Sequence, residues 1–160
     1  MRMKTMGGLV LLAAVIWACT GAAAGANGSG TTTLKCHVED HIQKFPTASS
    51  PGTVFSFVRC PAPLGRGIQH ATFRLTPKTS TTGSAVLRFK AYFDTGTVSG
   101  VWHATYRFTD AKTALFKQTV NWVRGTGAFK QIRATGTGRG VQHGFLGEIN
   151  QVLTVTGVSG

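Results

Sequence analysis

Acidic residues are scarce in this chain, which has five Asp and Glu against 17 Lys and Arg in 160 residues. So few carboxylates argue against a hydrolase that uses a carboxylate pair. The G-x-S-x-G elbow of serine hydrolases and the H-E-x-x-H motif of zinc proteases are also absent. The glycines that begin at Gly125 do not form a phosphate loop, because no helical pattern follows them. The sequence therefore predicts no catalytic residue.

Long apolar runs are missing as well. The longest, from Leu9 to Ala18, has about ten residues, whereas a membrane helix needs roughly 20. Arg2 and Lys4 precede it and small residues ending at Ala26 follow it, which is the order of a secretory signal peptide. We expect residues 1–26 to be removed and the protein to be secreted, in the periplasm or outside the cell. A lipid anchor on Cys19 is the less favoured alternative, because a bulky tryptophan lies beside that cleavage point.

The chain has only three cysteines, and removal of residues 1–26 leaves Cys36 and Cys60. Thiols in an oxidising compartment tend to pair, so we expect one disulfide between them. Closing a loop of about 25 residues stabilises a fold by on the order of 3 kcal/mol in the chain-entropy model. The alternative, a reactive free thiol, lacks a neighbouring motif.

Positive charge dominates the mature chain. Loss of Arg2 and Lys4 leaves 15 basic residues against five acidic ones, a net charge of about +10. Such a charge attracts anionic polymers or membrane surfaces without sequence preference. It also keeps a β protein soluble and protects its sheet edges, which is the simpler interpretation.

No helical period appears after the signal peptide, while β-branched and aromatic residues alternate between glycine and proline breaks. Residues 27–33 are small and polar, as in a flexible leader. Residues 34–160 are predicted to form one all-β domain, a single eight-stranded antiparallel barrel without edges. We place its strands at residues 34–39, 53–60, 68–75, 85–93, 98–108, 114–123, 131–137 and 148–156.

The central three strands allow a prediction of register. A two-residue turn at Thr95-Gly96 and a loop over residues 109–113 put large apolar side chains on one face and polar ones on the other. The expected pairs across the turn are Phe93 with Val98, Ala91 with Gly100, Phe89 with Trp102, Leu87 with Ala104 and Ala85 with Tyr106. The expected pairs across the loop are Phe108 with Ala114, Tyr106 with Phe116, Ala104 with Gln118, Trp102 with Val120 and Gly100 with Trp122.

The inward face mixes large aromatic residues with alanine and glycine. Such alternation either fills a small barrel or leaves a pocket at one end. Gln118 is the polar residue on this face, and its amide needs a partner in the backbone or on a ligand. The candidate ligand-binding residues are Phe89, Trp102, Tyr106, Phe116, Gln118 and Trp122.

The outward face carries cations, and we define the anion strip as Arg88, Lys90, His103, Arg107 and Lys117. Exposed aromatic residues that could stack on bases are expected to be limited to Tyr92, which disfavours sequence-specific nucleic-acid binding. His37, Glu39 and His41 would point the same way on a strand and could bind a metal weakly. A solvated segment is the favoured interpretation, so we predict no metal site and no cofactor.

Gly125-Thr-Gly-Ala-Phe129, followed by Gly136-Thr-Gly138, resembles the G-x-G-x-F-x-x-x-x-G signature of allene oxide cyclase and dirigent-like barrels. We expect these glycines to turn the backbone with positive φ in a tight cap between two strands, with Phe129 buried beneath it. The resemblance implies a secreted barrel with an apolar cavity open at one end. In some members the cavity steers a reactive intermediate without a covalent catalyst, and the plant dirigent proteins are often oligomeric. No functional residue of those families can be placed on this chain.

Three functions follow as expectations. The leading one is a non-catalytic module that binds a small apolar ligand. The first alternative is a basic surface that binds an anionic polymer or a membrane. The second alternative is a cyclase-like or dirigent-like enzyme, whose steric guidance would leave little trace in the sequence.

Overall fold

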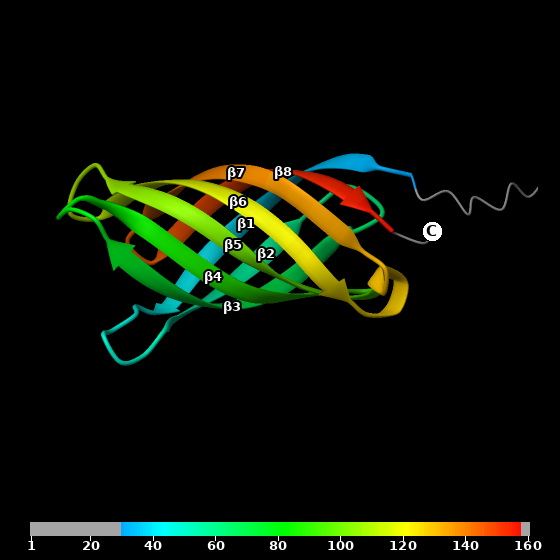
Figure 1. The fold of residues 1–160 in the computed structure, drawn as a ribbon, viewed down its shortest axis with the longest axis horizontal. Helices are drawn as coiled ribbons and strands as arrows, with labels where there is room; N and C mark the ends of the chain where they lie inside the picture. Colours follow the sequence, from blue (N-terminus) through cyan, green and yellow to red (C-terminus); the bar gives the residue numbers. More distant parts are fainter. Residues whose placement is uncertain (1–29, 158–160) are drawn as a thin grey trace, which may run out of the picture.

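The computed structural model describes residues 30–157, which form a closed antiparallel barrel of eight strands in sequence order (Figure 1). This confirms the predicted fold class. No helix within residues 30–157 is long and apolar enough to cross a membrane. The predicted signal peptide and Cys19 lie outside the described residues. The strands are β1 (Thr32–Lys44), β2 (Gly52–Arg59), β3 (Arg66–Pro77), β4 (Thr82–Phe93), β5 (Gly96–Phe108), β6 (Thr113–Gly125), β7 (Arg133–His143) and β8 (Leu146–Thr156).

Each predicted strand is present, and most are longer than expected. β1 begins at Thr32, so the last two residues assigned to the leader pair with β8. β7 continues through Gly138 and Gly140, where the sequence indicated a break. These glycines face the interior, and a Cβ at Gly140 would collide with the carbonyl oxygen of Glu148. They are needed for close approach of neighbouring groups and not for turning.

Of the four signature glycines, only Gly127 has a positive φ, at 60°. The prediction of positive φ at Gly125, Gly136 and Gly138 was therefore wrong. Gly125 is needed for a different reason, because a Cβ there would collide with the carbonyl oxygen of Phe129. A short 3-10 helix, η1 (Gly127–Phe129), folds back at this point and needs that space.

The β5–β6 register is as predicted, from Phe108 opposite Ala114 to Gly100 opposite Trp122. The β4–β5 register was predicted wrongly by two residues. The turn is Asp94-Thr95, so Phe93 lies opposite Gly96 and Phe89 lies opposite Gly100. A shift of two preserves which side chains face inward. The remaining corrected pairs are Ala91 with Val98, Leu87 with Trp102, Ala85 with Ala104 and Gly83 with Tyr106.

The segment between β6 and β7 explains the shift. The backbone N–H of Thr126 donates to the carbonyl of Thr97, at 2.9 Å, and that of Ala128 donates to Thr95, at 3.0 Å. Gly96 lies beneath this segment, and a Cβ there would collide with the carbonyl oxygen of Thr126. Glycine is thus required at position 96 by a contact with residues distant in sequence. Rules for hairpin turns consider only the residues of the hairpin itself and do not account for such a contact.

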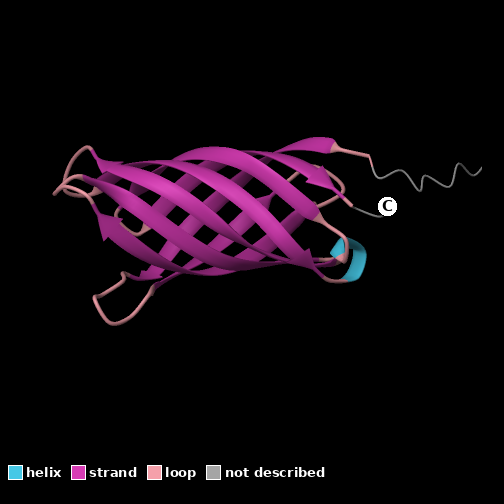
Figure 2. Cartoon of the chain, in the orientation of Figure 1, coloured by secondary structure: helices cyan, strands magenta, loops and turns pink. Residues whose placement is uncertain are grey.

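The two ends of the barrel differ. We call the end with the β2–β3, β4–β5 and β6–β7 connections the closed end, because η1 folds over it (Figure 2). Phe129 and Ile132 from the β6–β7 connection are fully buried. The predicted disulfide is confirmed at the same end, where Cys36 of β1 joins Cys60, which follows β2. The opposite end, with the β1–β2, β3–β4, β5–β6 and β7–β8 connections, is the open end.

Aromatic residues fill the interior toward the closed end. The centroid of the Phe89 ring lies 5.4 Å from that of the Trp102 ring and 6.3 Å from that of the Trp122 ring. Phe93 packs edge-on against Phe129, with ring centroids 5.7 Å apart. This half of the barrel is a solid core of interlocked rings.

Candidate functional site: an open-end cavity and an outer groove

The interior toward the open end is hollow. A cavity of about 400 Å³ lies there, within the size range of small-molecule sites. Small inward residues contribute to it, because Ala85, Ala104 and Ala114 line it and leave space between the larger side chains. Its larger apolar lining residues are Ile42, Phe45, Val54, Phe73, Leu75, Leu87, Tyr106, Phe108, Phe116 and Ile149.

Polar side chains interrupt this apolar lining, and Asp40 is the charged one that is buried. Asp40 of β1, Ser56 of β2 and Gln69 of β3 lie directly opposite one another in a row across the strands. The Gln69 amide Nε2 donates to the Ser56 hydroxyl at 3.4 Å, and the Ser56 hydroxyl donates to the Asp40 carboxylate. This row orients Asp40 and satisfies part of its hydrogen-bonding capacity.

Burial raises the pKa of Asp40 from 3.8 to about 6, and the Ser56 hydrogen bond opposes the rise. Desolvation disfavours the ionised carboxylate, which the single hydroxyl compensates only in part. The Asp40 atom Oδ1 is buried without a hydrogen-bond partner among the described residues. Asp40 therefore presents an unused acceptor when ionised and can donate when protonated.

Gln118 of β6 and Gln142 of β7 supply two further amides to the lining. Gln142 Nε2 donates to the carbonyl of Gly144 at 3.2 Å, whereas Gln118 Nε2 is buried without a partner among the described residues. Gly138 makes room for the Gln118 side chain, whose Nε2 would lie 2.8 Å from a Cβ at that position. The free Gln118 donor is the second unused polar group of the cavity.

The structure divides the predicted ligand-binding residues into two groups. Tyr106, Phe116 and Gln118 line the cavity. Phe89, Trp102 and Trp122 are buried in the solid core of the closed half. The sequence left a filled barrel and a pocket at one end as alternatives, and each describes one half of the molecule.

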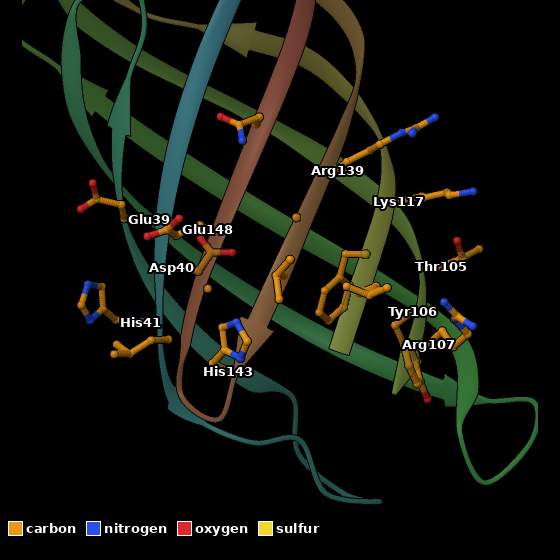
Figure 3. A pocket seen from close by; sticks show the side chains of 17 residues that line it. Glu39, Asp40, His41, Thr105, Tyr106, Arg107, Lys117, Arg139, His143 and Glu148 are labelled. Carbon is orange, nitrogen blue, oxygen red and sulfur yellow. The ribbon is translucent and has the colours of Figure 1, made fainter. Parts of the chain in front are cut away.

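Residues of β1, β8, β7, β6 and β5 line a groove of about 1120 Å³ (Figure 3). Its charged residues other than Asp40 lie on the outer face, whereas Asp40, Tyr106 and Phe116 line both the groove and the cavity. Glu39 of β1 lies directly opposite Glu148 of β8 on one side of the groove. Lys117 of β6 lies directly opposite Arg139 of β7 on the other side, and Figure 3 shows these cations apart from the acids. Arg107 of β5 also lines the groove.

Like charges that face each other across two strands destabilise a sheet. Glu39 is neutralised by Arg59, 3.1 Å away, and lies 3.7 Å from His37. Lys117, Arg139 and Arg107 form no ion pair with any described residue. The groove therefore has an uncompensated cationic side.

The structure does not bring the whole anion strip together. All five of its residues are exposed on the outer face of β4, β5 and β6. Arg107 and Lys117 line the groove, but Arg88, Lys90 and His103 do not. Lys90 instead lies over the Tyr92 ring, 5.1 Å from its centroid. Arg139, which the sequence analysis missed, completes the cationic side.

The expectation that exposed aromatic residues are limited to Tyr92 was wrong. Phe57 is 43% exposed on the outer face, compared with 40% for Tyr92. Phe55 and His70 lie between them in a row of rings. The centroid distances are 5.1 Å from Phe57 to Phe55, 5.1 Å from Phe55 to His70 and 6.4 Å from His70 to Tyr92. The error arose because the inward phase of β2 was not assigned from the sequence, so the facing of its phenylalanines was unknown. The argument against nucleic acid from the lack of stacking surfaces therefore loses its basis.

His37, Glu39 and His41 lie on the outer face of β1, as strand alternation predicted. His37 Nδ1 lies 3.1 Å from Asn150 Oδ1, and the His41 ring packs against Phe57. Within residues 30–157, no group of three or more His, Cys, Asp or Glu side chains is placed to hold a metal ion. The segment is thus engaged with neighbouring side chains of β2 and β8.

Comparisons with protein-family models, with curated proteins and with solved structures found no match to this chain. Its class is defined by the fold and the site. It is a closed, basic, eight-stranded antiparallel barrel with one plugged end and one hollow end.

Proposed function

We propose that this protein is a secreted barrel that binds a small, mostly apolar molecule in the open-end cavity. The observation that carries the proposal is the cavity itself, about 400 Å³ of space lined mainly by apolar side chains. The closed end supplies a rigid support for it, through the buried Phe129 and the Cys36–Cys60 disulfide. The disulfide also supports a location outside the cytoplasm.

We further propose that the barrel is of the allene oxide cyclase and dirigent type, which its glycine signature resembles. The closed eight-stranded topology and the burial of Phe129 beneath the β6–β7 connection support this proposal. Binding does not require a catalytic group, and the proposed role is that of a binding module.

A cavity-filling substitution tests the proposal. Ala85→Phe places a ring into the cavity, whereas Ser84→Phe adds the same ring to the neighbouring, exposed position on β4. We expect Ala85→Phe to weaken binding of the neutral fluorescent probe N-phenyl-1-naphthylamine by about tenfold or more, and Ser84→Phe to leave it unchanged. Equal affinity of both variants, or no probe binding by the natural protein, would refute the proposal.

A second function is favoured by the groove, which we propose as a binding site for anionic groups. The supporting observation is that Lys117 lies opposite Arg139 and Arg107 lines the same groove, while none of the three pairs with an acidic side chain in the part of the chain that the structure describes. An anion placed there removes the repulsion between the cations, and its affinity must decrease with salt.

Paired double variants test the groove. Lys117→Ala with Arg139→Ala and the control Arg88→Ala with Lys90→Ala remove the same charge from different places on the outer face. We expect the groove variant to bind a heparin oligosaccharide about tenfold more weakly than the control does, at low salt. An equal loss in both would show that the overall charge acts without a site.

A further inference from the structure

The cavity is not a uniform apolar container, because Asp40 Oδ1 and Gln118 Nε2 have no hydrogen-bond partner within residues 30–157. Asp40 and Gln118 are 6% and 5% exposed, and both line the cavity. Buried polar groups are almost always hydrogen-bonded. Among the described residues, Trp102, Trp122 and Gln151 each also have a buried nitrogen without a partner, but these side chains do not line the cavity. Asp40 and Gln118 differ from them because they border space that an occupant can fill. The two groups are complementary, since one accepts and the other donates.

Resting on the proposed function, we infer that the ligand is an uncharged, hydroxyl-bearing apolar molecule that donates a hydrogen bond to Asp40 and accepts one from Gln118. One hydroxyl or two separate polar groups can meet these demands. The apolar remainder of the ligand lies against the alanine and aromatic residues of the lining.

The charges around the cavity disfavour ligands that carry a carboxylate or an ammonium group. Asp40 is the carboxylate of the lining, so a ligand carboxylate meets like charge in a desolvated space. An ammonium group would pair with Asp40 but cannot accept from Gln118, and it must enter past Lys112 in a domain of net charge about +10. A hydroxyl avoids both conflicts.

The protonation state of Asp40 makes this selectivity depend on pH. The other titratable groups of the lining are Tyr106 of β5 and Lys112 of the β5–β6 loop, while β2, β3, β4, β6, β7 and β8 contribute none. As the pH falls below about 6, Asp40 is protonated and its repulsion of a carboxylate disappears. Discrimination against an acid ligand should therefore weaken at low pH.

Competition against N-phenyl-1-naphthylamine tests the inference with four ligands that share a 12-carbon chain: 1-dodecanol, its methyl ether, dodecanoate and dodecylamine. At pH 7.5 we expect the alcohol to displace the probe about tenfold more effectively than each of the other three, because one charge-assisted hydrogen bond is worth about that factor. Between pH 7.5 and 5 the gap between alcohol and dodecanoate should narrow. This arm needs no variant.

Two variants sharpen the test. Asp40→Asn keeps the shape but removes the charge, so the alcohol should lose its advantage over dodecanoate. Gln118→Leu removes the donor, so the alcohol and the ether should weaken together, while Ser84→Phe serves as the neutral control. Circular dichroism verifies that each variant folds.

The outcomes separate the two proposals. If the probe binds and Ala85→Phe removes its binding, but all four competitors act equally at every pH, the cavity binds apolar molecules and the inference is wrong. Water alone would then complete Asp40 and Gln118. If the probe does not bind, the proposed function itself fails.

Discussion

The closed and open halves of this barrel are built from the same eight strands but carry different side chains at their inward-facing positions. In the closed half those positions hold Trp102, Trp122 and Phe89, covered by Phe129 and locked by the disulfide. In the open half they hold alanines, the polar residues Asp40, Gln118 and Gln142, and larger apolar side chains such as Phe73 and Tyr106 that surround the cavity without filling it. Because a small barrel must bury enough apolar surface to fold, a solid half is what permits a hollow half that contains polar groups.

The largest expected effect tests whether the closed half contributes more to stability than the open half. Phe129→Ala removes a fully buried ring from the closed end and should lower the free energy of unfolding by about 3–5 kcal/mol. Phe116→Ala removes a ring that is half-buried and already borders the cavity, so its cost should be less than half as large. Urea unfolding monitored by tryptophan fluorescence measures both. Equal losses would show that the two halves contribute alike.

A smaller effect concerns the cost of the buried carboxyl group. Because the folded-state pKa of Asp40 is raised from 3.8 to about 6, the contribution of Asp40 to the unfolding free energy is greatest below pH 3.8 and is lost as the pH rises through about 6. The loss is on the order of 3 kcal/mol, at 1.36 kcal/mol for each pKa unit. Asp40→Asn lacks this titration.

Unfolding of the two proteins at a series of pH values checks the sign. Between pH 4 and pH 7 the natural protein should lose stability relative to Asp40→Asn by roughly that amount. Parallel stability profiles over this range would mean that Asp40 is not desolvated in the folded state, and the polar row across β1, β2 and β3 would lose its assigned role.

The sequence was sufficient for the architecture because strand alternation and turns are local signals. The inward facing of Phe89, Trp102 and Gln118 was correct even though the β4–β5 pairs were displaced by two residues, since alternation depends on parity alone. The displacement itself came from the β6–β7 connection, which packs on Gly96 from 30 residues away in the chain.

The candidate site was predictable only in part. Tyr106, Phe116 and Gln118 were found because they share the inward phase of β5 and β6. Asp40 was missed as an interior residue, although it follows Val38 and precedes Ile42 in the same phase of β1. That phase was a usable signal, but the predicted strand ended at Glu39 and the segment with His37 and His41 was interpreted as solvated. The alternation of large and small residues allowed a pocket at one end, but the extent of the cavity and the groove depends on how distant strands meet, which local patterns do not specify.

The most direct test of the central claim is a map of where a ligand contacts the barrel. Carbon-13-labelled protein is titrated with 1-dodecanol, and the methyl and aromatic NMR signals are followed. The account predicts shifts at open-half residues such as Ile149, Leu75 and Phe116, with Ile132 and Phe129 unchanged. Shifts spread over both halves, or confined to the outer face, would contradict it.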